Sequence, residues 1–239
     1  MKYSLENLLV LDIETVRSHN TYEDMPERLQ AQWDRKSNFL RSEEEESPKE
    51  LYEDRAGIYA EFGKVVSISV GFFTYVGSEL SLRVKALYNE DEAILLNEFN
   101  ELLRKFDSKN LTLCGHNGKE FDFPYLCRRM LINNIKLPPV LDTSGKKPWE
   151  VNHLDTMEMW KFGDRKNFTS LELLATLFDI PTSKDAIDGS QVSTVYYNEQ
   201  DLEKIAEYCS KDVVVTAQLL LKLNQQPIIK EENIHLIEN

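Results

Sequence analysis

Asp12 and Glu14 stand near the end of an apolar run, residues 8–15, with the sequence LLVLDIET. A short run of Leu, Val and Ile bounded by polar residues is typical of a strand buried on both faces. Because side chains alternate across a strand, Asp12 and Glu14 project from one face at its carboxyl end. Two such carboxylates repel each other unless a cation lies between them, and hard divalent cations prefer oxygen ligands. The pair therefore indicates a metal site, with a solvated turn as the alternative reading of so short a motif.

A third carboxylate, Asp122, follows a short apolar strand predicted over residues 111–114. The intervening sequence GHNGKEFD, residues 115–122, leads into a helix predicted from about 123 to 133. Open α/β sheets place their ligand sites where a parallel strand is followed by a helix. Asp before Phe-Pro also suits an ordinary helix cap, so both interpretations of Asp122 stay open.

Tyr208 and Asp212 lie four residues apart in a helix predicted over residues 199–223. Side chains at this spacing lie one above the other on a single helix face. Asp212 is followed by three valines, so its carboxylate is expected to be partly buried and to need a partner. A nearby lysine or a metal ion would each satisfy it.

The other predicted elements surround these motifs. They are a mainly helical insertion at 17–62, a hairpin of residues 64–75 and 80–88, an amphipathic helix at 91–106, an edge strand ending at Asp155, and a helix at 169–178. Residues 1–224 are expected to form a single domain, and residues 225–239 a loosely held tail.

The chain is acidic, with 28 Lys and Arg against 41 Asp and Glu and a formal net charge of −13. Phosphate binding is normally led by Lys and Arg, so this balance argues against a general nucleic-acid coat. Contact with phosphate would have to be local, and the alternative for any short basic group is a solvated face. The basic groups are Lys119 with Arg128 and Arg129, Lys146 with Lys147, and Lys161 with Arg165 and Lys166.

Cellular location is indicated by two negative features of the sequence. The three cysteines, Cys114, Cys127 and Cys209, have no C-x-x-C spacing and resemble reduced core residues. No stretch approaches the roughly 18 consecutive apolar residues of a membrane span, and a signal-peptide pattern is missing from the start. We therefore expect a cytoplasmic protein without membrane contact.

Together the motifs resemble the DEDD superfamily of 3'-5' exonucleases, in the subclass with Tyr in its third motif. The resemblance is closest to free-standing exonucleases related to the exonuclease domain of family B DNA polymerases. It spans about residues 9–221, and residues 17–62 are its least covered part. It rests on D-x-E at 12–14, N-x-x-x-F-D at 117–122, Ser170-Leu171, Ile180-Pro181, Asp188-Gly189-Ser190 and Y-x-x-x-D at 208–212.

The resemblance implies an α/β, RNase H-like fold, with a five-stranded mixed sheet flanked by helices and a helical insertion after the first strand. The four metal-organising carboxylates would be Asp12, Glu14, Asp122 and Asp212. Asp12 would bridge two Mg²⁺ ions, which Mn²⁺ can replace, and Tyr208 would orient the attacking water. The residues near the terminal nucleotide would be Thr15, Asn117 and Phe121.

These expectations describe a metal-dependent 3'-5' exonuclease that shortens single-stranded nucleic acid from its 3' end, with DNA as the substrate. Two divalent ions can activate a water and stabilise the leaving oxygen, and Mg²⁺ suits carboxylate and water ligands. One alternative is a 3'-5' exoribonuclease, because contacts to the 2'-OH leave no motif. Another is a non-catalytic nucleic-acid or partner-binding module on an RNase H-like scaffold. A DNA polymerase or repair factor bound through the insertion is compatible with each of these.

Overall fold

The protein is built on a six-stranded sheet with the strand order β5-β4-β1-β2-β3-β6. The computed structural model describes residues 3–40, 46–106, 110–164, 168–182 and 187–237. The strands are β1 (Leu8–Arg17), β2 (Gly63–Val76), β3 (Glu79–Tyr88), β4 (Thr112–Gly115), β5 (Leu154–Asp155) and β6 (Ile234–Ile237). The sheet is mixed, because β1 pairs antiparallel with β2 and parallel with β4.

Strand β1 lies inside the sheet and is buried on both faces, as its apolar run predicts. Leu9, Leu11 and Ile13 belong to the core cluster on one face of the sheet. Leu8 and Val10 belong to the cluster on the other face. The strand is therefore held from both sides, and its carboxyl end is a rigid place from which to present polar side chains.

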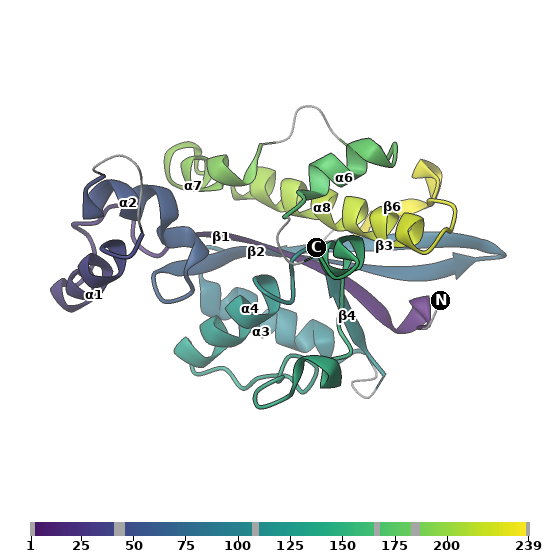
Figure 1. Ribbon diagram of the computed structural model, residues 1–239, viewed down its shortest axis with the longest axis horizontal. Helices are drawn as coiled ribbons and strands as arrows, with labels where there is room; N and C mark the ends of the chain where they lie inside the picture. Colours follow the sequence, from purple (N-terminus) through teal and green to yellow (C-terminus); the bar gives the residue numbers. More distant parts are fainter. Residues whose placement is uncertain (1–2, 41–45, 107–109, 165–167, 183–186, 238–239) are drawn as a thin grey trace.

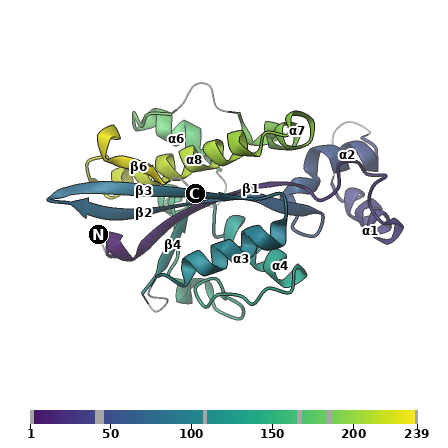
Figure 2. The ribbon, with the colours of Figure 1, turned by 180° about the vertical axis from the view of Figure 1, so that it is seen from behind.

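Helices cover both faces of the sheet (Figures 1 and 2). On one face lie α3 (Glu92–Leu103) and α4 (Asp122–Ile132). On the other face lies the long α8 (Leu202–Leu223), against which α5 (Thr156–Lys161) and α6 (Leu171–Leu177) pack. The short elements are α7 (Val192–Thr194), a π-helix at Val195–Glu199 (η5), and 3-10 turns at Leu5–Asn7 (η1), Ala56–Ile58 (η2), Pro148–Glu150 (η3), Gly189–Gln191 (η4) and Glu231–Asn233 (η6).

The insertion between β1 and β2 is mainly helical and forms its own small core. It contains α1 (Glu27–Ser37) and α2 (Pro48–Arg55), which lie beyond the carboxyl end of β1 (Figure 1). The Trp33 ring meets Tyr52 and Phe62 edge-on, with centroids 5.4 and 4.9 Å away. Ser47 begins α2 with a capping box, which satisfies backbone N–H groups at the first turn.

The sheet has six strands and not the five that the resemblance implies. The additional strand is β6, which pairs parallel with the outer edge of β3 and comes from the segment expected to be a loosely held tail. Its approach is fixed by Gln218 on α8, whose buried amide accepts from the Ile229 N–H at 2.8 Å and donates to the Ile229 carbonyl at 2.7 Å. These contacts join distant parts of the chain, so the local sequence of residues 225–239 does not predict them.

No helix in the described part of the chain is both long and apolar enough to cross a lipid bilayer.

Candidate active site

Asp12 and Glu14 lie on the face of β1 that is covered by α8. A carboxylate oxygen of each lies within 4.8 Å of the other and of the Cys209 sulfur on α8. The Glu14 side chain is only 9% exposed. The pairing of β1 with β2 is regular through Asp12 and Glu14 and shifts by one residue only after Glu14. Strand alternation therefore brings the two acids together, as their i, i+2 spacing predicts.

Asp122 reaches the same place from the first residue of α4. Its Oδ1 accepts a hydrogen bond from the Ile13 backbone N–H at 3.1 Å, between the two strand acids. The cap position of α4 is held by Phe121, and no side chain caps the helix there. Asp122 thus binds β1 and is not an ordinary helix cap.

The loop before α4 is shaped by close backbone contacts. A Cβ atom at Gly115 would lie 3.0 Å from the Gly118 Cα atom, so the turn admits only glycine there without displacement. Asn117 between them adopts the left-handed conformation, with φ of 63°. This tight turn directs the chain from the end of β4 back toward β1.

Asp155 anchors this loop and is a residue whose role sequence reasoning missed. Its buried carboxylate accepts from the backbone N–H groups of Asn117 and Lys119, each at 3.0 Å, and from Met157 N–H at 3.0 Å as the cap of α5. Asp-Thr before a helix is a recognisable cap signal. Nothing in the sequence, however, connects it to a loop about 40 residues earlier.

Tyr208 and Asp212 complete the group from α8. The Tyr208 hydroxyl lies close enough to the Asp212 carboxyl to influence its pKa. The intervening Cys209 is fully buried, and its thiol donates to Asp12 Oδ2 at 3.3 Å. Ser210 Oγ lies 3.2 Å from Ser69 Oγ on β2, which further fixes the helix on the sheet. The structure therefore gathers all five of these predicted residues from three separate elements.

The carboxyl groups influence one another electrostatically. Burial, reinforced by the charges of Asp122, Glu14 and Asp212, raises the pKa of Asp12 well above its usual value. Burial and the charges of Asp212 and Asp122 do the same to the pKa of Glu14. Burial raises the pKa of Asp122 to about 7 and that of Asp212 to about 6. Bringing four acids together without a cation therefore costs stability at neutral pH.

The metal-free protein should consequently lose stability as the pH rises. In the folded state these groups hold their protons more tightly than in the unfolded chain, so their stabilising contribution is complete below about pH 4 and is lost as the pH rises through about 7. We expect the free energy of unfolding, measured with urea in EDTA, to fall over this range. The Asp122→Asn variant should show a shallower fall, and equal slopes for variant and wild type would contradict the assignment.

The donor set fits a hard divalent cation. Carboxylate oxygens are the ligands that Mg²⁺ and Mn²⁺ take, and a cation would relieve the repulsion that raises these pKa values. Asp12, Glu14, Asp122 and Asp212 are therefore the residues that would hold it. The sulfur of Cys209 faces the same cluster and is a softer donor, less suited to Mg²⁺.

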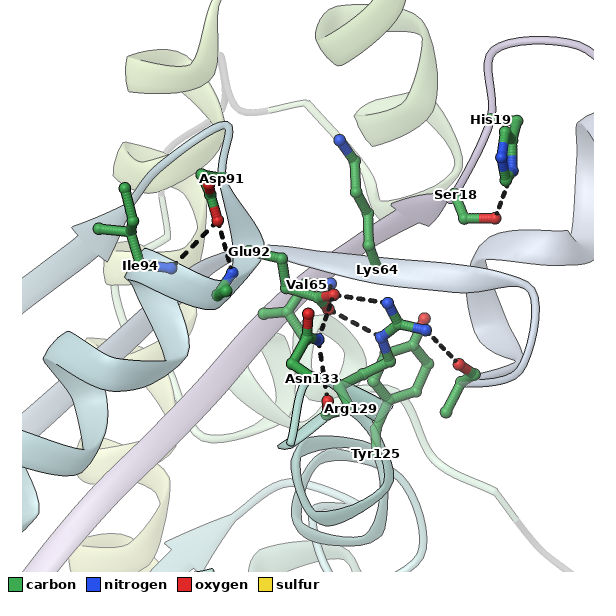
Figure 3. Close-up of polar contacts among 12 residues, drawn as sticks. Ser18, His19, Lys64, Val65, Asp91, Glu92, Ile94, Tyr125, Arg129 and Asn133 are labelled. Atoms are coloured by element: carbon green, nitrogen blue, oxygen red, sulfur yellow. Dashed lines mark hydrogen bonds and ion pairs between the residues drawn. The ribbon is translucent and has the colours of Figure 1, made fainter. Parts of the chain in front are cut away.

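Two of the basic residues for which phosphate contact and a solvated face were both open have other partners. The Lys119 ammonium pairs with Glu158 at 2.8 Å. Arg129 is buried on α4 and binds Glu92 of α3 through Nε at 2.8 Å and Nη2 at 2.5 Å (Figure 3). Proximity in sequence to Arg128 indicated a surface group, whereas the partner of Arg129 lies 37 residues earlier. Arg165 and Lys166 lie outside the described residues.

Arg129 and Tyr125 of α4 join the insertion to the helix that carries Asp122. Glu92 also accepts from the Val65 N–H at 2.8 Å, and Arg129 Nη1 donates to the Ala60 carbonyl at 2.9 Å (Figure 3). One turn earlier on α4, the Tyr125 hydroxyl donates to the Gly57 carbonyl at 2.8 Å. The insertion therefore contacts α4 at Tyr125 and Arg129, whereas Asp122 lies at the first position of the helix.

Removing one partner of this buried pair should be strongly destabilising. The Arg129→Met variant leaves the Glu92 carboxylate buried without its cation, and we expect a loss of about 3–5 kcal/mol in the free energy of unfolding. Urea denaturation measures this directly. The matched control is Lys49→Met, which breaks an exposed pair with Glu23 and should change stability little. An equally small effect of Arg129→Met would contradict the structural role given to the pair.

The predicted nucleotide-contacting residues are dispersed around the acids. Thr15 lies close enough to the Tyr125 hydroxyl of α4 to influence its pKa. The Phe121 ring packs on Tyr125, with centroids 5.4 Å apart. Asn117 contributes backbone groups to the loop, accepting from Phe121 N–H at 3.0 Å. Contact of these three residues with a nucleotide remains a prediction.

A comparison with protein families identifies the chain. Residues 58–231 match the family described as "Predicted 3'-5' exonuclease related to the exonuclease domain of PolB". The chain belongs to this family. The matched region contains Asp122, Tyr208 and Asp212, whereas Asp12 and Glu14 precede it.

Curated relatives of this PolB-related exonuclease family member include DNA polymerases. The chain is 28% identical to a DNA polymerase of Pyrococcus glycovorans over 141 residues, which are 54% of this chain and 18% of the relative. It is 24% identical to DNA polymerase 1 of Pyrococcus abyssi over 179 residues, 66% of this chain and 22% of the relative. The chain thus spans about a fifth of the length of these polymerases.

A solved structure shows the same fold. The family B DNA polymerase of Pyrobaculum calidifontis superposes with a TM-score of 0.54 and 16% identity, over 90% of this chain and 24% of the polymerase. The mixed sheet flanked by helices is accordingly RNase H-like, as the sequence resemblance implies. The match establishes the fold, while the chemistry must be argued from the residues.

Proposed function

We propose that this protein is a metal-dependent 3'-5' exonuclease that removes nucleotides from single-stranded DNA. The observation that carries the proposal is the convergence of Asp12, Glu14, Asp122 and Asp212 inside the fold, where burial and the charges of the neighbouring acids raise the pKa values of Asp12 and Glu14. Structural acids are seldom buried together without cations, because each charge adds to the cost of the others. The family relationship supports nucleotide removal from a 3' end as the use of such a site.

Asp12, Glu14, Asp122 and Asp212 would hold two Mg²⁺ ions. When bound, such ions supply Lewis acidity toward the attacking water and the leaving 3' oxygen. The protein's part is to fix its carboxylates before substrate arrives: Asp122 through the Ile13 N–H, and Asp12 through the Cys209 thiol. Preorganised ligands need no rearrangement during the reaction, which favours catalysis.

Tyr208 is suited to orient the water and not to deprotonate it. Burial and the charges of Asp212, Glu14 and Asp12 raise the pKa of its hydroxyl. The group therefore stays protonated throughout the neutral range and acts through hydrogen bonds.

The function is tested by digestion of 5'-labelled strands. Single-stranded and duplex DNA and RNA are incubated with the protein, with and without Mg²⁺, and the products are separated on a gel. We expect a ladder of progressively shorter single-stranded DNA in Mg²⁺, which a 3'-terminal phosphate should block. Faster shortening of RNA would make the protein an exoribonuclease, and binding without shortening of any strand would make it a non-catalytic module.

Substituting Tyr208 should weaken catalysis without abolishing it. Tyr208→Phe removes the orienting hydroxyl but leaves every carboxylate in place, so we expect the single-turnover rate in Mg²⁺ to fall about 10- to 100-fold. Tyr197→Phe, which removes a hydroxyl bound to the Arg17 carbonyl, is the control for a lost buried hydroxyl. A Tyr208→Phe rate as low as that of Asp212→Ala would contradict the orienting role.

A further inference from the structure

Phe168 is an exposed aromatic residue with a cation over its face. Its side chain is 67% exposed, and the Lys161 ammonium lies 4.4 Å from the centre of its ring. Lys161 is the last residue of α5, and Phe168 stands three residues before α6. Burial of apolar area does not account for a phenylalanine in this position.

A hydrogen bond next to Phe168 connects this segment to the loop that leads toward Asp122. His116, the residue after β4, donates from Nε2 to the Thr169 carbonyl at 3.0 Å, next to Phe168. Its Nδ1 is then free to accept from the Thr156 hydroxyl, 2.9 Å away on α5. Burial, with the nearby Lys161 charge, lowers the pKa of His116, so the ring is neutral and can make both contacts.

The same segment borders the acidic site at its other end. Ser170 caps α6, and Glu172 in the first turn lies close enough for its charge to raise the pKa of Asp212. On the strand side, the Gly115 backbone before His116 lies against the carbonyl of Leu11, the residue before Asp12. Residues 169–172 therefore extend from His116, just after β4, toward Asp212 on α8.

Among the described residues Lys161 is one of the lysines that form no ion pair, as are Lys36 and Lys147, which also lie over aromatic rings. Lys49, Lys204 and Lys230 each lie within 4 Å of a carboxylate. None of the ion pairs between described residues includes Lys161. An unneutralised ammonium beside an exposed ring combines the two features with which proteins hold single strands, a charge for phosphate and a face for base stacking.

We propose that Phe168 and Lys161 form a stacking platform for the single-stranded 3' end, with the ring under a base and the ammonium at the neighbouring phosphate. The proposal rests on the proposed function and assigns the binding of the single strand to Phe168 and Lys161. Because stacking does not depend on base identity, the platform predicts little sequence preference.

The test measures binding separately from hydrolysis. Fluorescence anisotropy of a 5'-labelled single-stranded oligonucleotide is followed in an Asp212→Asn background, which prevents turnover. A 2-aminopurine at the position next to the 3' end reports stacking through quenching of its emission. The variants are Phe168→Ala, Phe168→Tyr and Lys161→Gln. The matched controls are Phe39→Ala, which removes a ring that is 84% exposed on the insertion, and Lys36→Gln, which removes an ammonium 3.8 Å from the Tyr59 ring.

We expect Phe168→Ala to weaken binding about tenfold and to abolish the quenching, while Phe168→Tyr retains both. Lys161→Gln should weaken binding and reduce its salt dependence. Binding and quenching by Phe168→Ala equal to those of Phe39→Ala would overturn the platform, even if the wild type is an active exonuclease. Loss of binding in Phe168→Ala would uphold the platform even if the wild type hydrolysed no strand, which would overturn the proposed function alone.

Discussion

Replacing Asp12 or Asp212 with alanine should reduce Mg²⁺-dependent nucleotide release by about a thousandfold or more. Asp12 lies at the centre of the acidic group, where the charges of Asp122, Glu14 and Asp212 all act on it. In the proposed function each of these acids is a metal ligand, and its loss would remove several kcal/mol of transition-state stabilisation; about 4 kcal/mol corresponds to a thousandfold in rate. The measurement is the initial rate of shortening of a 5'-labelled single strand.

The same variants should lose activity but gain thermal stability, and this difference separates a loss of catalysis from a loss of the fold. In EDTA, removing one of four mutually repelling acids relieves repulsion, so Asp12→Ala should melt at a higher temperature than the wild type. Asp54→Ala on the insertion, which removes an exposed acid, is the control and should alter neither property. Near-normal activity of Asp212→Ala would remove this residue from the site.

Removing divalent metal should abolish hydrolysis, and this is the second large effect. In the proposed function the acids act through bound cations, so EDTA should stop nucleotide release, and added Mg²⁺ or Mn²⁺ should restore it. Binding to the folded state alone also stabilises it. Mg²⁺ should therefore raise the melting temperature more at pH 8 than at pH 5. At pH 5 protons compete with Mg²⁺ for the carboxylates of Asp122 and Asp212, whose pKa values are about 7 and 6.

Chelation must be complete for the comparison to be informative. Protein dialysed against EDTA and then against metal-free buffer provides the reference, and Ca²⁺ serves as a divalent control for stabilisation without efficient chemistry. Undiminished strand shortening in the dialysed protein would refute metal dependence. An equal shift of the melting temperature at both pH values would show that Mg²⁺ binds somewhere other than the acidic group.

The sequence predicts those parts of the site that local rules govern. Strand alternation places Asp12 with Glu14, and helical periodicity places Tyr208 with Asp212. Helix caps follow a similarly local rule, since Ser170 accepts from Leu173 N–H at 3.3 Å at the start of α6. Each of these signals depends on residues fewer than five positions apart.

The remaining features depend on partners that are distant in sequence. The Asp122 carboxylate was ambiguous until the Ile13 N–H, 109 residues away, proved to be its donor. Arg129 resembled a surface residue because Glu92 lies on another helix. Strand β6 forms because the edge of β3 offers unpaired backbone groups and Gln218 holds the approaching chain. The partners of these residues and the pairing of β6 are determined by tertiary contacts, which the local sequence pattern does not reveal.

The central claim is that four acids from β1, α4 and α8 hold a pair of divalent cations, and counting bound Mn²⁺ tests it most directly. Free Mn²⁺ is measured by electron paramagnetic resonance during titration of the metal-free protein in the presence of a deoxynucleoside 5'-monophosphate. The account predicts two bound Mn²⁺ ions per chain in the wild type and fewer than two in Asp12→Ala. Absence of Mn²⁺ binding to the wild type, or binding that Asp12→Ala leaves unchanged, would contradict it.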